Sequence, residues 1–115
     1  MRDNNMSEKR RHKRLDLALP VILRCGGRLI PATMLNLSCG GARIRAEETN
    51  FSDNAPVELI FDLDKQTYDI SMRGNIVHAT EDPTSQTGCF AGVQFADAIS
   101  DSHKAVENYL KKNLN

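Results

Sequence analysis

Two short polar stretches hold the residues of this chain that are best suited to bind a small charged molecule. The first is the run 9–14, Lys-Arg-Arg-His-Lys-Arg, and the second is the run 36–41, Asn-Leu-Ser-Cys-Gly-Gly. Guanidinium groups four residues apart, as at Arg10 and Arg14, can hold phosphates through paired hydrogen bonds and stack on flat bases. An amide, a hydroxyl and two glycines can present side-chain and backbone groups to another part of the same ligand. The two runs together predict a site for a small, flat, doubly charged molecule.

The second run offers several groups that suit a nucleobase. The Asn36 amide can pair with the edge of a base, and the Ser38 hydroxyl can both donate and accept a hydrogen bond. Gly40 and Gly41 can adopt positive φ and let a ligand approach the backbone closely. Guanine presents N7 and O6 to an arginine fork, so the arginines of the first run can hold guanine with one group and phosphate with another. An alternative is that Asn36 and Ser38 only hydrogen-bond their own turn.

The charge distribution limits the classes of partner. The chain has 115 residues, enough for one domain with a single hydrophobic core, and 15 basic residues balance 15 acidic ones. Residues 1–17 nevertheless carry six Lys or Arg against three acids. A neutral protein with a basic arm is a poor general binder of nucleic acid and suits one compact anion.

Cysteine use and hydropathy indicate a soluble protein without metal or disulfides. The three cysteines are odd in number and show no CxxC spacing, which predicts a reducing, cytoplasmic setting. No apolar run reaches the length of a membrane span, so we expect no membrane insertion. We also find no nucleophile–base pair and no set of metal ligands, so we expect neither an enzyme nor a bound cofactor.

Hydrophobic residues alternate with polar ones along most of the chain, which is typical of half-buried antiparallel strands. Gly26-Gly27 predicts a hairpin, and Pro31 indicates an edge or a bulge. Arg43 and Arg45 fall at exposed strand positions, and Tyr68 falls on the buried face of its strand. The predicted strands are residues 18–25, 29–35, 42–47, 57–63, 68–76 and 88–95, and residues 81–87 form a loop.

The period changes to that of a helix after the last strand. Ser100 or Asp101 suits the N-cap, and Val106, Tyr109, Leu110 and Leu114 recur at helical spacing. Six short strands with one closing helix predict an all-β fold, either a small barrel or a strongly curved sheet. The helix is expected to bury its apolar stripe against one barrel mouth or edge.

The order and spacing of these residues resemble the PilZ domain, a bacterial receptor module for cyclic di-GMP. Its signature is RxxxR on an N-terminal arm followed by (D/N)xSxxG, which residues 10–14 and 36–41 match. Residues 74–78 and 92–95 look like the GxVV and GVxF strands of that family. The resemblance implies a six-stranded antiparallel β-barrel with a flexible N-terminal arm and a C-terminal α-helix. The expected parts are a disordered tail (1–8) and a PilZ domain (9–115), divided into arm (9–17), barrel (18–97) and helix (100–114).

The resemblance also implies the ligand and its contacts. Arg10 and Arg14 are expected to contact phosphate and the Hoogsteen edge of guanine, and Asn36 and Ser38 are expected to contact the guanine edge or a phosphate. Asparagine replaces the commoner aspartate of the family, which removes a charge-assisted bond to guanine. The full set expected to bind cyclic di-GMP is Lys9, Arg10, Arg14, Asn36, Ser38, Gly41 and His78.

Lys9, Gly41 and His78 are expected to contribute in other ways than the arginines. Lys9 stands where many members carry a further arginine, and it lacks a planar fork. Gly41 is expected to keep the turn open. His78 falls near a position that is a tryptophan lining the site in some members, but a structural or solvent-facing histidine is the alternative.

Three functions are compatible with these features. The first is a non-catalytic cyclic di-GMP sensor that orders its arm on binding and signals to an unidentified effector protein, because the chain contains no output domain. The second is a PilZ-like protein–protein adaptor that binds no nucleotide. The third is a barrel that binds single-stranded nucleic acid, which the lack of aromatic residues near the basic arm disfavours.

Overall fold

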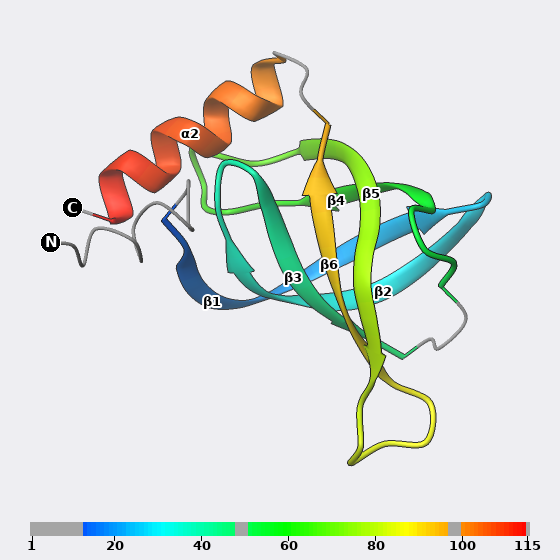
Figure 1. Ribbon diagram of the computed structural model, residues 1–115. Coiled ribbons are helices and arrows are strands. Elements are labelled where there is room, and N and C mark those ends of the chain that lie inside the picture. Colours follow the sequence, from blue (N-terminus) through cyan, green and yellow to red (C-terminus); the bar gives the residue numbers. More distant parts are fainter. Residues whose placement is uncertain (1–12, 48–50, 97–99, 115) are drawn as a thin grey trace, which may run out of the picture.

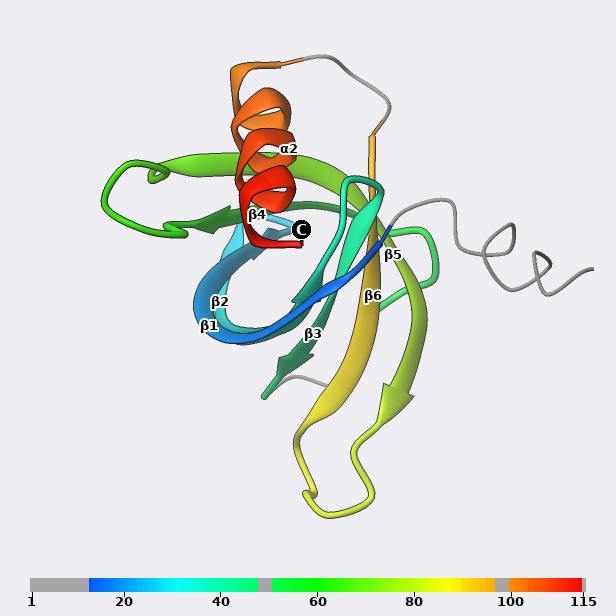
Figure 2. The same cartoon turned by 90° about the vertical axis from the view of Figure 1, so that its left-hand side faces the viewer.

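The structure is a computed structural model that describes residues 13–47, 51–96 and 100–114. Within these residues, six antiparallel strands close into a barrel in the order β1-β2-β3-β6-β5-β4, and one helix lies against an end of it (Figures 1 and 2). The predicted all-β fold is therefore confirmed as a six-stranded barrel. The elements are β1 (Leu15–Cys25), β2 (Arg28–Leu37), β3 (Gly41–Ala46), β4 (Pro56–Phe61), β5 (Ile70–Glu81), β6 (Cys89–Phe95) and α2 (Asp101–Asn113).

The barrel interior is formed by every second residue of the strands, as the alternating sequence predicts. Leu23, Ile44, Leu59 and Ile76 are fully buried there, one from each of four strands. Removing such side chains from water supplies most of the stabilisation of a domain of this size. The outer surface is therefore left to the polar members of each strand, where a ligand site must lie.

Tyr68 departs from the expected alternation and is 63% exposed. It precedes β5 instead of belonging to it. The next residue, Asp69, has a φ of 57° that turns the chain before the strand begins at Ile70. The prediction that Tyr68 faces the core is wrong because this turn interrupts the period-two pattern.

The first strand begins earlier than the sequence suggests. β1 starts at Leu15, so the last three residues expected in the arm belong to the barrel. Leu15 and Leu17 are partly buried and pack against the core, which explains why the strand extends to them. β2 likewise continues to Leu37, and its register shift falls between Met34 and Asn36, beyond Pro31.

The helix is fixed to the barrel by its cap and by its apolar stripe. The Ser100 hydroxyl accepts a hydrogen bond from the His103 N–H at 3.1 Å, which confirms Ser100 as the N-cap. Val106 and Leu110 are buried against the core. The Ser71 N–H of β5 donates to the Ser102 hydroxyl at 3.1 Å, so β5 holds the first turn of α2.

Candidate functional site

Strand pairing brings Arg14, the last residue of the first polar stretch, next to the second stretch. Leu15 is paired with Leu37 across β1 and β2. Arg14 immediately precedes Leu15, and Ser38 immediately follows Leu37, so the end of the first run adjoins the start of the second. The start of β1 lies beside the β2–β3 turn in both views (Figures 1 and 2). Lys9 and Arg10, the other predicted residues of the first run, lie outside the described residues.

The Ser38 side chain is engaged in its own turn. Its hydroxyl accepts hydrogen bonds from the N–H groups of Gly40 and Gly41 and donates to the Gly41 carbonyl, all at 3.2 Å. The Phe95 N–H donates to the Gly40 carbonyl at 2.9 Å and ties the turn to β6. Ser38 therefore organises the backbone of the turn.

Gly41 is required for a reason that the sequence does not reveal. Among the described residues, the glycines with positive φ are Gly26 and Gly27 of the β1–β2 hairpin, so Gly41 does not serve the turn in that way. A Cβ atom at Gly41 would instead lie 2.3 Å from the Val93 carbonyl oxygen. The expectation that Gly41 keeps the turn open is corrected: its lack of a side chain lets β3 approach β6 closely.

Asn36 faces outward in a row of paired residues that crosses five strands. The pairs are Asp16 with Asn36, Asn36 with Arg43, Arg43 with Gly92, and Gly92 with Val77. The neighbours of these residues along each strand are buried or partly buried, except for the exposed His78 in the bulge after Val77, so the row lies on the outer surface. Within the described part of the chain, the Asn36 amide makes no hydrogen bond. It is therefore available to a ligand, in contrast to Ser38.

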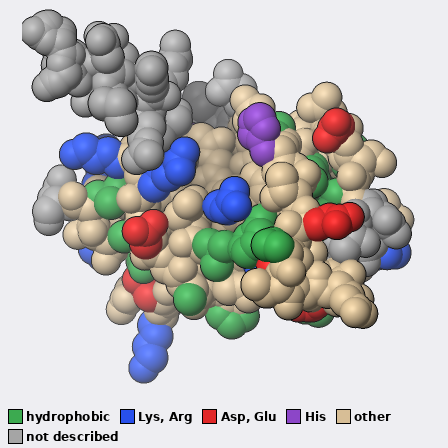
Figure 3. Space-filling model, turned by 60° about the horizontal axis from the view of Figure 1, so that its bottom comes forward, with side chains coloured by type: hydrophobic (Ala, Val, Ile, Leu, Met, Phe, Trp, Pro, Cys, Tyr) green, Lys and Arg blue, Asp and Glu red, His purple; other side chains and the backbone are tan. Residues whose placement is uncertain are grey.

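We call the outward-facing residues of this region the motif face. It joins polar and positively charged side chains to two partly buried hydrophobic ones. Figure 3 shows one side of the molecule, on which Lys and Arg side chains lie beside exposed hydrophobic side chains. The motif face consists of Arg14, Asn36, Ser38, Arg43, Val77, Phe90 and Gly92.

His78 lies next to the motif face in an irregular part of β5. The pairing of β5 with β6 shifts between Val77 and Thr80, and His78 has a φ of 55° within this bulge. Its side chain is exposed. Such bulges re-aim side chains near the ends of strands. The structure thus places His78 one residue from Val77, on the solvent side.

The Arg45 guanidinium forms ion pairs with two acidic neighbours. Its Nε donates to Asp82 Oδ2 at 2.8 Å, and its Nη1 lies 2.5 Å from Glu47 Oε2. Asp82 is only 6% exposed and also accepts hydrogen bonds from the backbone N–H and hydroxyl of Thr84. These bonds, those of Thr84 foremost and that of Arg45 next, lower the pKa of Asp82 from 3.8 to about 2. Arg45 therefore holds the β5–β6 loop and is not free to bind a ligand.

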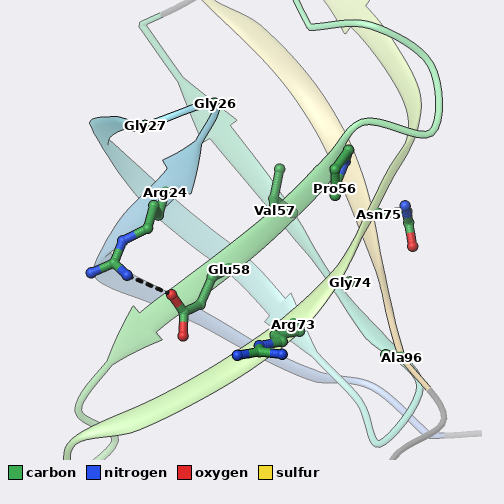
Figure 4. A pocket seen from close by; sticks show the side chains of 10 residues that line it. All are labelled: Arg24, Gly26, Gly27, Pro56, Val57, Glu58, Arg73, Gly74, Asn75 and Ala96. Carbon is green, nitrogen blue, oxygen red and sulfur yellow. Dashed lines mark ion pairs between the residues drawn. The ribbon is translucent and has the colours of Figure 1, made fainter.

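A shallow depression of about 390 Å³ lies away from the motif face (Figure 4). Arg24 and Arg73 line it, and Arg24 is paired with Glu58 at 3.2 Å. None of the predicted site residues lines it. The depression and the motif face are therefore separate features of the barrel.

The described residues provide neither a metal-binding group nor a membrane-spanning helix. They contain no group of three His, Cys, Asp or Glu side chains able to hold a metal ion. Nor does the described part of the chain include a helix with the length and apolarity needed to cross a bilayer.

The turn generates a prediction about stability. Gly41→Ala forces two backbones apart and is expected to lower the free energy of unfolding by about 1–3 kcal/mol. Ser38→Ala removes three hydrogen bonds of the turn and should cost about 1 kcal/mol or more. Asn36→Ala, which removes no hydrogen bond in the described part of the chain, should change it by less than about 0.5 kcal/mol. Urea denaturation measures all three, and equal effects at the three positions would contradict the assigned roles.

The buried Asp82 generates a prediction about pH. Because its folded pKa lies below its ordinary value of 3.8, the carboxylate stabilises the fold above about pH 4. This contribution should be lost as the pH falls from 3.8 towards 2. Asp82→Asn should be less stable than wild type at pH 7, and the difference should shrink at pH 3. The matched control is the exposed Asp53→Asn, and urea midpoints that shift equally in both variants would refute the role of Asp82.

Comparison with known proteins identifies relatives of the fold. A family model described as PilZ domain matches residues 8–112. The inhibitor of motility of Bacillus subtilis (MotI/DgrA) is 21% identical, with a TM-score of 0.74 over 93% of this chain and 52% of its own. The chain thus spans about half the length of that protein. No curated protein matches this chain.

Two further solved structures match this chain over most of its length and over most of their own length. The PilZ domain of YcgR from Escherichia coli, solved with c-di-GMP, is 11% identical with a TM-score of 0.69, over 90% of each chain. The PilZ domain of CeSA from a cellulose-synthesizing bacterium is 16% identical with a TM-score of 0.63, over 90% of this chain and 99% of its own. At these identities the likeness establishes the fold.

Proposed function

We propose that this chain, which belongs to the PilZ domain family, is a non-catalytic cytoplasmic receptor for cyclic di-GMP. The observation that supports the proposal is the pairing of Leu15 with Leu37, which sets Arg14, the last residue of the first signature stretch, beside the second stretch. A site divided between an arm and a turn needs this proximity. The E. coli YcgR domain, solved with c-di-GMP, shares the fold and supports the choice of ligand.

The proposed contacts follow from the chemistry of each group. Arg10 and Arg14 bind phosphate oxygens and the N7 and O6 atoms of guanine through their planar forks. Asn36 presents its free amide to a base edge or a phosphate, and Lys9 adds positive charge. Ser38 and Gly41 contribute by shaping the turn. Ser38 can offer the ligand only the hydrogen-bonding capacity that its three bonds within the turn leave unused. His78 borders the site.

The signal is proposed to leave the domain through a partner protein. Neutralisation of Arg10 and Arg14 by the ligand phosphates orders the N-terminal arm against the barrel. The ordered arm and the motif face then present a new surface to an effector. In this proposal the surface itself is the output.

Loss of the arginines tests the proposed site. Arg10→Ala and Arg14→Ala should each weaken binding of cyclic di-GMP by about 100-fold or more, since charge-assisted paired bonds are lost from an ionic ligand. Isothermal titration calorimetry measures the affinity and the stoichiometry. Arg73→Ala, an exposed strand arginine away from the motif face, serves as the control for charge. Wild-type affinity in both arm variants would show that the ligand binds elsewhere or not at all.

A protein–protein adaptor that binds no nucleotide is the second candidate. The observation that favours it is the Ser38 hydroxyl, whose hydrogen bonds stay within the turn. Amide NMR spectra recorded during a cyclic di-GMP titration separate the two functions. A receptor should show shifts that saturate at residues 8–14 and 36–41 and remain small around the β1–β2 hairpin at Gly26. Unchanged spectra at millimolar ligand would favour the adaptor.

A further inference from the structure

Arg43 and Phe90 form a stacked pair on the outer surface of the barrel. Arg43 is paired with Gly92, and Phe90 lies two residues before Gly92 on the same face of β6. The Arg43 guanidinium carbon is 5.2 Å from the centre of the Phe90 ring. A cation at this distance over an aromatic face is attracted by the ring quadrupole. The pair therefore favours one position of a guanidinium that would otherwise be mobile in water.

The charge of Arg43 is left without an acidic partner in the part of the chain that the structure describes. Arg45 lies directly opposite Phe90, yet its guanidinium is held by Asp82 and Glu47. Arg43 extends diagonally to the ring instead and is exposed. Of the two arginines on β3, only Arg43 can offer its full hydrogen-bonding capacity to a ligand.

The surroundings of Arg43 suit a flat aromatic ligand. Gly92 beside it carries no side chain, and Val77 leans over this glycine so closely that an added Cβ would lie 3.1 Å from Val77 Cγ2. Val77 and Phe90 thus form a partly buried hydrophobic floor. Asn36, the cross-strand partner of Arg43, adds on the other side an amide that makes no hydrogen bond to the described residues. A base lying on this floor would have an arginine fork and an amide beside it.

We propose that Arg43, held in place by Phe90, contacts a base of the bound dinucleotide and makes the site select guanine over adenine. This inference rests on the proposed function and adds a third arginine to it, from the barrel itself. Guanine presents two acceptors, O6 and N7, to an arginine fork, whereas adenine places the N6 amino group where O6 would be. A donor facing a donor leaves one hydrogen bond unmade, which disfavours adenine.

Calorimetric titration of the full chain with cyclic di-GMP and with cyclic di-AMP tests the inference. Wild type should prefer the guanine ligand. Arg43→Ala should weaken cyclic di-GMP binding by about 10-fold or more and reduce the preference over cyclic di-AMP. Arg43→Lys keeps the charge but not the fork, so it should recover only part of the loss. Phe90→Leu should weaken binding to a smaller extent, with thermal unfolding recorded to verify that the barrel is intact.

The control variant and the possible outcomes separate this inference from the proposed function. Arg73→Ala removes the same charge from an exposed strand position outside the motif face and should bind like wild type. If Arg43→Ala binds within twofold of wild type while Arg14→Ala does not bind, the inference fails and the proposed function stands. Full recovery by Arg43→Lys would reduce the role of Arg43 to charge and overturn base selection. Absence of binding by wild type would overturn both.

Discussion

The pairing of the first residues of β1 with the last residues of β2 is the constraint on which the site depends. The partly buried Leu15 lies opposite the fully buried Leu37, and this pair sets the local register on the N-terminal side of the shift between Asp16 and Leu19. A slip of one residue would turn these leucines outward and Asp16 and Asn36 inward, at a large cost in buried apolar surface. Hydrophobic burial in the barrel thereby decides that Arg14 lies next to the turn that begins at Ser38 and that Asn36 faces outward beside Arg43.

The residues of the signature divide into those that build the site and those that remain available to a ligand. Ser38 closes its turn through three hydrogen bonds, and Gly41 allows β3 to approach the Val93 carbonyl. Within the described residues, Asn36 and Arg14 make no such hydrogen bond and allow no such close approach. Some residues of a motif that resembles a set of ligand contacts therefore determine the backbone conformation of the site instead. This division explains why such a motif specifies fold and site together.

Sequence periodicity was sufficient for most of the strands, because alternation of apolar and polar residues is local information. It left a barrel and a strongly curved sheet as alternatives, and the family resemblance favoured the barrel. Periodicity failed at Tyr68, where the positive φ of Asp69 ends the alternation, and at Leu15, whose place in a strand depends on a partner 22 residues away. The arginines of β3 looked equivalent for the same reason. Only the three-dimensional register shows that Arg45 meets Asp82 and that Arg43 stacks on Phe90.

The turn of the second stretch is also held by packing against the core. Cys39 is partly buried against the core, and this burial raises the pKa of its thiol, with the Glu107 carboxylate of α2 acting in the same direction. The Gly40 carbonyl is fixed by β6, and Ser38 by its own turn. A segment held on three sides changes little when a ligand arrives, because each contact would have to be broken. Under the proposed function, the conformational response therefore belongs to the chain before Leu15, and the barrel acts as the fixed half of the site.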